Sequence, residues 1–280
     1  MSKKNSSSWW VGVALASVTL FAQASPTVVY SSLGPDVFNL PSLGYQATST
    51  SEFGDRIGFA GGPRTLDSVT VRMSNWALQS TYAGNPAYTN AAGYDHELTF
   101  NIYGAGVGNL PGALIGTQTI TTLVPWRPEA DPTCPNGGTA WRATDGNCYN
   151  GLAFDVVFDF SSAGLVLPDD IVFGLAFNTQ SYGSAPEGVE GPYNSLNFGL
   201  SAAATEGTDT DPDAVFWNTS FAGFLTTGTP GVFSQDTLWA GYVPAVEFAT
   251  TAVPEPGTLA LAGLALFGLV QSRRRAARQG

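Results

Sequence analysis

Residues 154–160 read Phe-Asp-Val-Val-Phe-Asp-Phe, and residues 171–177 read Ile-Val-Phe-Gly-Leu-Ala-Phe. In both segments a large apolar side chain stands at every second position. Because successive side chains of a β-strand point to opposite faces, a period of two predicts strands with one buried face. The turn sequence Pro168-Asp169-Asp170 separates the two segments. The pattern therefore indicates β structure rather than helix.

The same alternation extends in both directions along the chain. It is clear at 69–74 and 97–102, and further candidates are 27–32, 113–122, 195–201, 214–219 and 238–249. Turns rich in glycine and proline separate these segments, with almost no helical periodicity between them. We expect an all-β protein in which about nine or ten strands form a single antiparallel β-sandwich, jelly-roll-like in topology. The connections 78–95, 125–150 and 178–194 are long for such a fold.

The N-terminus has the three parts of a secretory signal peptide. Lys3 and Lys4 form a basic start, residues 9–22 are mostly apolar, and Ala22-Gln23-Ala24 is a small-x-small cleavage site. We therefore expect residues 1–24 to direct Sec-type export and to be removed by signal peptidase. The body of the protein, a β-sandwich ectodomain at 25–249, would then act outside the cytoplasm.

The C-terminus carries a different tail. Pro254, Glu255 and Pro256 lie in a short linker, 250–256; a mostly apolar segment, 257–272, and a basic segment, 273–280, follow. As a helix, residues 257–270 would span ~21 Å, which is shorter than the ~30 Å core of a bilayer. The arginines at the end, Arg273, Arg274, Arg275 and Arg278, can reach the headgroups and would orient the C-terminus toward the cytoplasm. We expect a transmembrane sorting helix; the alternative is a buried C-terminal helix with a basic end.

This tail resembles the C-terminal signal of the PEP-CTERM proteins, and Pro254, Glu255 and Pro256 carry the resemblance. It implies export in a Gram-negative bacterium and processing by an exosortase, an integral-membrane protease. It also implies a body first anchored in the periplasm through the membrane helix, then a place at the cell surface or in the extracellular matrix. PEP-CTERM proteins occur with exopolysaccharide and biofilm systems, so exopolysaccharide is an expected partner.

The body is also similar to an uncharacterised group of exported bacterial β-domains, a resemblance that implies no activity. The segments that carry it are Asn101-Ile-Tyr-Gly104, Pro111-Gly-Ala-Leu-Ile-Gly116, Asn150-Gly-Leu-Ala-Phe154 and Thr208-Asp-Thr-Asp-Pro-Asp-Ala-Val-Phe-Trp-Asn218.

Charge is unevenly distributed along the chain. Residues 25–252 contain 21 acidic side chains and five arginines, a net charge of −16, and no lysine. Such a surface repels phosphate backbones, so nucleic-acid binding is disfavoured, whereas divalent cations are attracted. The two cysteines, Cys134 and Cys148, enclose a 15-residue segment. In an exported protein this spacing predicts a structural disulfide.

Two features of the body suggest ligands. Glu206, Asp209, Asp211 and Asp213 place four carboxylates in eight residues, which favours either a calcium site or a solvated acidic turn. The spacing is not that of an EF-hand, because position 6 is Ala214 and position 12 is Ser220. Trp126, Trp141 and Tyr149 lie in or beside the disulfide loop. They could stack sugar rings as a glycan-binding platform or cover the end of the core.

No catalytic constellation is evident. His96 is the single histidine, expected at the surface, and Gly-x-Ser-x-Gly is absent. Asp155 and Asp159 would lie ~13 Å apart along one strand, too far for a glycosidase pair. We therefore expect a non-enzymatic surface or matrix protein with a glycan-binding or biofilm role. The alternatives are a secreted hydrolase of polysaccharides and a purely structural surface protein.

Overall fold

The computed structural model describes residues 25–35, 37–107, 110–135, 138–183, 185–219 and 233–252. The expected signal peptide, the Pro-Glu-Pro motif, the sorting helix and the basic tail lie outside the described residues. Ser25–Val253 forms one compact unit. Within the described part of the chain, no helix is long and apolar enough to cross a membrane.

Strands dominate the described residues, which confirms the all-β prediction. In chain order they are β1 (Thr27–Ser31), β2 (Ser42–Gly44), β3 (Thr50–Gly58), β4 (Thr65–Asn75), β5 (Gly93–Ala105), β6 (Pro111–Pro125), β7 (Trp141–Arg142), β8 (Cys148–Tyr149), β9 (Leu152–Asp159), β10 (Asp170–Ala176), β11 (Leu196–Ser201), β12 (Thr208–Asp209), β13 (Ala214–Thr219), β14 (Ser234–Thr237), β15 (Val243–Pro244) and β16 (Val246–Thr251). The short helix α1 (Tyr45–Thr48) and 3₁₀ turns at Gln79–Tyr82, Pro86–Tyr88 and Pro192–Ser195 lie between strands.

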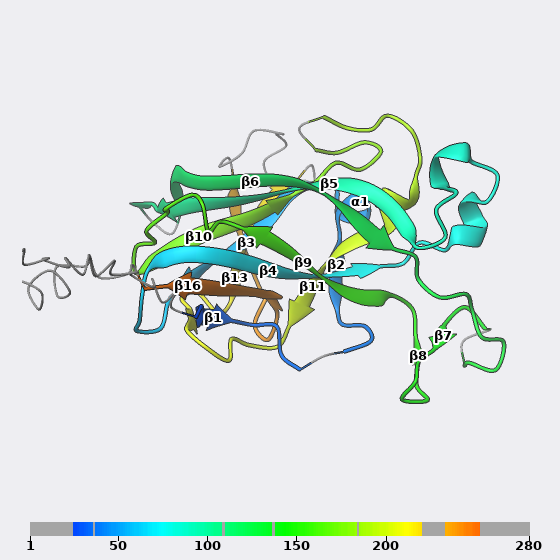
Figure 1. Ribbon diagram of the computed structural model, residues 1–280, viewed down its shortest axis with the longest axis horizontal. Coiled ribbons are helices and arrows are strands. Elements are labelled where there is room, and N and C mark those ends of the chain that lie inside the picture. The colour runs from blue at the N-terminus through cyan, green and yellow to red at the C-terminus, as the bar shows by residue number, and fades with distance from the viewer. Residues whose placement is uncertain are drawn as a thin grey trace, which may run out of the picture. The chain divides into compact units, whose positions relative to one another are not determined.

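Two antiparallel sheets form the sandwich. The first has the order β1-β16-β4-β9, and the second contains β3-β10-β5-β6. Figure 1 shows the second sheet with β5, β6 and β10 in one layer and β4, β16 and β1 in the layer below. Numbered along the chain, these eight strands give the orders 1-8-3-6 and 2-7-4-5. This is the connectivity of a jelly roll, which confirms the expected fold.

An insertion between β10 and β16 enlarges both sheets. In the first sheet, β11 pairs with the end of β4 beyond β16, and β2 pairs with β11. In the second sheet, β13 pairs with β3 and β14 pairs with β13, so the sheet extends beyond β3. β12 pairs with the other end of β3, next to β13. As a result, β3 is an interior strand of the sheet rather than its edge.

Aromatic side chains from both sheets form the centre of the core. Phe158 and Phe248 come from the first sheet, and Phe100 and Phe173 come from the second. All four are fully buried, with ring centroids 5.4–5.9 Å apart between contacting pairs. Burying one such side chain stabilises the fold by about 1.5–3 kcal/mol. The alternating phenylalanines therefore hold the two sheets together.

Two strands differ from what the sequence predicted: β3 was not expected, and β16 ends later than expected. β3 was not expected, because Gly54, Gly58 and three charged residues interrupt its apolar alternation. A side chain at Gly54 would have its Cβ 1.7 Å from the carbonyl oxygen of Phe173, so only glycine permits this pairing with β10. At the other end of the domain, Thr250 is buried and pairs with Leu66. β16 therefore includes Thr250 and Thr251, the first two residues of the range expected for the linker.

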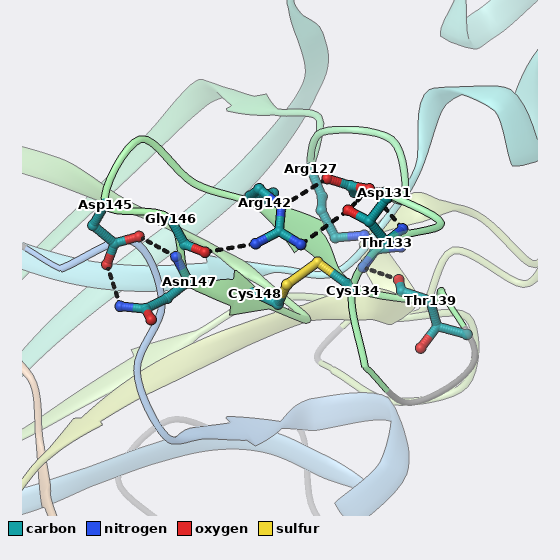
Figure 2. The surroundings of a disulfide bond; sticks show 10 residues. All are labelled: Arg127, Asp131, Thr133, Cys134, Thr139, Arg142, Asp145, Gly146, Asn147 and Cys148. Carbon is teal, nitrogen blue, oxygen red and sulfur yellow. Dashed lines mark hydrogen bonds and ion pairs between the residues drawn. A yellow bond between two sulfur atoms is a disulfide. The ribbon is translucent and has the colours of Figure 1, made fainter.

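The predicted disulfide between Cys134 and Cys148 is present and closes the loop that holds β7 and β8. Figure 2 shows Arg142 bridging this loop. Its guanidinium donates to Asp131 at 2.9 Å, to the hydroxyl of Thr133 at 2.9 Å and to the carbonyl of Gly146 at 2.7 Å. Arg127 anchors the base of the loop by donating to the carbonyls of Thr139 and Asn150. The loop is thus a separately braced extension of the sandwich.

Replacing both cysteines with serine is expected to lower the free energy of unfolding by up to about 3 kcal/mol, the loop-closure term for a loop of this size. The sandwich should survive, because its core does not depend on the loop. Urea unfolding of residues 25–253, followed by tryptophan fluorescence, measures the change. The unreduced and reduced forms of the unaltered domain serve as controls. Coincident unfolding curves for the double variant and the oxidised domain would show that the bond does not stabilise the fold.

Candidate functional site

The outer face of the second sheet carries a polar cleft. On β3, β10 and β5 the side chains of Phe53, Leu175 and Phe100 enter the core, so their neighbours in sequence face outward. A cavity of about 310 Å³ opens on this face. The described residues that line it are Ser51, Glu52, Glu97, Thr99, Asn101, Leu114, Thr117, Ala176, Phe177, Asn178 and Asn218.

Glu52 is a buried carboxylate in this cleft, with only 2% of its surface exposed. Its Oε1 accepts hydrogen bonds from the amide of Asn101 at 2.7 Å and from the hydroxyl of Tyr103 at 2.9 Å. The neighbouring strand makes room for it at Gly174, where an added Cβ would lie 2.4 Å from Oε1. Two hydrogen bonds to the same oxygen atom, from side chains on β5, hold Glu52 in one orientation.

The polar network continues from Glu52 to the walls. The hydroxyl of Thr117 donates to Asn101 Oδ1 at 2.7 Å, which fixes the orientation of that amide. Glu97 is exposed where it lines the cleft, and Leu114 offers a partly exposed apolar side chain. The cleft therefore presents carboxylate, amide and hydroxyl groups beside a small apolar surface. This set of groups suits a ligand with many hydroxyls.

The aromatic residues that the sequence suggested for glycan binding lie elsewhere. Trp126 and Trp141 are 8% and 6% exposed. Trp126 packs against Tyr82 and Tyr94, and its indole N–H donates to the carbonyl of Asn90 at 2.7 Å.

Trp141 donates to the carbonyl of Gly151 at 2.8 Å and packs against Tyr149, which is half-buried against Phe38. Neither indole offers a face on which a sugar ring could stack. The structure thus corrects the platform hypothesis at Trp126 and Trp141 and supports the alternative, that large aromatics cover the end of the core.

The acidic turn lies at the opposite end of β3. Asp209 belongs to β12 and accepts the backbone N–H of Asp211 at 3.0 Å, while Gln235 donates to the carboxylate of Asp211. Glu206 bonds through its backbone to Ser31, and Asp213 is exposed. Within the described ranges, no three His, Cys, Asp or Glu side chains are arranged to hold a metal ion. The calcium hypothesis therefore gains no support from the geometry.

A buried carboxyl group lies beneath this turn. Asp55 is fully buried on the core side of β3; its Oδ1 accepts the backbone N–H of Arg56 at 2.8 Å. Its Oδ2 has no hydrogen-bond partner among the described residues, and neither has the hydroxyl of Tyr30. Burial, followed by the nearby charge of Asp209, raises the pKa of Asp55 well above its usual value. Asp55 therefore keeps its proton to a higher pH than an exposed aspartic acid does.

His96 is buried rather than at the surface, because β5 places it on the core side with Tyr94 and Leu98. Its Nε2 lies 2.9 Å from the carbonyl oxygen of Asn178, and its ring stacks on Tyr193. Burial lowers the pKa of His96 to about 4, so the imidazole is neutral at physiological pH. These contacts give His96 a structural role.

Replacing Asp55 with asparagine is expected to remove a loss of stability that begins as the pH rises above about 4, the usual pKa of aspartate. A carboxyl group with a raised folded pKa stabilises the fold below its unfolded pKa. That stability is lost, by about 1.4 kcal/mol per pH unit for one proton, as the pH rises toward the folded pKa. Asp55→Asn keeps the shape of the neutral acid and removes this decline. Urea midpoints across a pH series measure the effect, with Asp213→Asn as the exposed control. Parallel profiles for Asp55→Asn and the unaltered domain would contradict a raised pKa at Asp55.

Comparison with known proteins identifies the tail. The PEP-CTERM protein-sorting motif matches residues 252–275, which include Pro254, Glu255, Pro256 and the first three arginines of the basic segment. Comparisons with curated proteins and with solved structures gave no match. The motif indicates export and membrane-associated sorting by an exosortase. The chain carries a PEP-CTERM sorting motif at residues 252–275, and this motif supports an exported surface protein that an exosortase sorts through its C-terminus.

Proposed function

We propose that the exported body is a non-enzymatic glycan-binding module of the cell surface or extracellular matrix, and that the cleft beside Glu52 holds the sugar. The observation that carries the proposal is the built polar floor of the cleft, in which a buried carboxylate is oriented by Asn101 and Tyr103 over Gly174. A merely solvated surface has no need of such an arrangement.

The chemistry of the cleft fits a carbohydrate. Sugar hydroxyls both donate and accept, so they are bound well by carboxylates, which accept, and by amides, which do both. The cavity of about 310 Å³ is at the lower end of the range for small-molecule sites, about 300–1,000 Å³. The site also lies on interior strands of a sheet, which hold such groups more rigidly than loops do.

The proposed location follows from the sorting signal. We infer that the body is first held in the periplasm by its C-terminal helix and reaches the surface or matrix after exosortase processing. Exopolysaccharide is the glycan that such a protein would meet there. Its role would be to attach to that polymer in the biofilm matrix rather than to modify it.

A polysaccharide hydrolase is the second candidate, because the cleft contains two carboxylates, Glu52 and Glu97. Glu52 aligns with Ala176 and Ala176 with Thr99, so Glu97 lies two strands across and two residues along. From strand geometry the Cα atoms are then roughly 12 Å apart. Glu52 already accepts two hydrogen bonds, which suits holding a ligand better than donating a proton. A purely structural surface protein is the third candidate.

Filling the space at Gly174 tests the binding site. Gly174→Ala should displace Glu52 and weaken glycan binding about tenfold, the effect of losing one good charged hydrogen bond. The matched control is Gly61→Ala, whose added Cβ would meet no atom within 4 Å. A glycan array of residues 25–253 identifies the ligand and calorimetry measures the affinities; circular dichroism checks the fold. Absence of binding to every glycan would contradict the proposal, and release of reducing ends would favour the hydrolase.

The sorting motif is tested in a host that contains an exosortase. Replacing Pro254, Glu255 and Pro256 with alanine should leave an uncleaved, membrane-held precursor, because the protease would no longer recognise the tail. Immunoblots of membrane and extracellular fractions distinguish the precursor from the processed form. Alanines at Gln271 and Ser272 serve as the control. Normal processing and release of the triple variant would exclude these residues as the recognition element.

A further inference from the structure

The cleft has a negative charge that its own walls do not offset. Glu52 and Glu97 are its two charged residues among those described, and no Lys, Arg or His lines it there. Asn101 and Tyr103, which donate to Glu52 and orient it, are both neutral. Neutral donors hold a carboxylate in place without cancelling its charge.

The arginines of residues 25–252 bind partners outside the cleft. Four of them form ion pairs with aspartates: Arg56 with Asp170, Arg64 with Asp169, Arg72 with Asp155 and Arg142 with Asp131. The fifth, Arg127, donates to two backbone carbonyls of the disulfide loop. Residues 25–252 contain these five arginines and no lysine, so the body itself has no other lysine or arginine to bring to the cleft.

A cationic ligand would supply the missing charge. An ammonium group near a carboxylate in a partly buried site gains more from the attraction than it does in open water. The net charge of −16 on residues 25–252 acts in the same direction at longer range. Ligands with carboxylates of their own would be repelled by both.

We infer that the cleft selects glycans that contain unsubstituted amino sugars, whose ammonium group would lie near Glu52 and Glu97. This inference rests on the proposed function, because it assumes that a sugar occupies the cleft. The amides and hydroxyls would bind the sugar hydroxyls, and Leu114 would contact the apolar face of the ring. The carboxylates would then distinguish a free amine from its neutral N-acetyl form.

The test compares three oligosaccharides of equal length: oligomers of glucosamine, of N-acetylglucosamine and of galacturonate. Calorimetry with residues 25–253, which contain both sheets, the core and the disulfide, is run at mildly acidic pH, where the sugar amine is charged. The glucosamine oligomer should bind roughly three- to tenfold more tightly than the N-acetylated one, as expected for one partly solvated ion pair. The galacturonate oligomer should bind least.

Three variants test which carboxylates produce the preference for the glucosamine oligomer. Glu97→Gln should abolish most of the preference for the glucosamine oligomer, because it removes a negative charge from the cleft. Glu97 is exposed, so the replacement is expected to leave the fold unchanged. Glu52→Gln should also abolish most of the preference while still accepting the hydrogen bonds of Asn101 and Tyr103. Glu247→Gln removes an equal charge from the outer face of the first sheet and should leave the preference intact.

Each outcome has one meaning. Equal affinity for the glucosamine and N-acetylglucosamine oligomers would overturn the inference while leaving the glycan-binding function in place. A preference that persists in Glu97→Gln and Glu52→Gln would place amine selection outside the cleft and would also overturn it. Failure of the unaltered domain to bind any of the three oligomers, or any glycan on the array, would contradict the proposed function itself.

Discussion

The close pairing of β3 with β10 is the constraint on which the rest of the structure depends. Two glycines make it possible: Gly54 lies against the backbone of Phe173, and Gly174 lies beneath the side chain of Glu52. Any larger residue at Gly54 would force the strands apart. Because β3 has strands on both sides, it sits in the interior of the second sheet and carries one carboxylate to each face.

The carboxyl groups of Glu52 and Asp55 lie on the same strand but have different hydrogen-bond partners and neighbouring charges. Glu52 points to the outer face, where an amide and a hydroxyl donate to it and hold it in place as an acceptor for polar groups. Asp55 points inward and accepts one backbone N–H, and its burial, followed by the nearby charge of Asp209, raises its pKa. The first suits recognition, whereas the second is part of the core.

Alternating phenylalanines made most of the jelly roll predictable, because the period of two survives wherever a strand has one buried face. β3 escaped prediction because it is buried on both faces and its sequence, Thr50-Ser-Glu-Phe-Gly-Asp-Arg-Ile-Gly58, mixes charges with glycines. The cleft depends on that strand, so the sequence did not indicate Glu52. The tryptophans near the disulfide misled for a related reason. Sequence shows that a loop is long, but not that Trp126 packs onto the core or that Trp141 is buried against Phe38 and Tyr149. The sorting tail and the disulfide were predictable because local spacing alone defines them.

Charge segregation links sorting to the proposed recognition. Six of the 11 lysines and arginines, Lys3, Lys4, Arg273, Arg274, Arg275 and Arg278, lie in the two terminal segments for which the sequence predicts roles in export and membrane orientation. Positive charge is needed there, because it orients a segment in the membrane. Removal of both segments would leave a strongly acidic body whose five arginines all have partners. Such a body stays soluble in a matrix, is repelled by acidic polymers and is attracted to cationic ones. Maturation would therefore produce the electrostatic preference at the same step that frees the domain from the membrane.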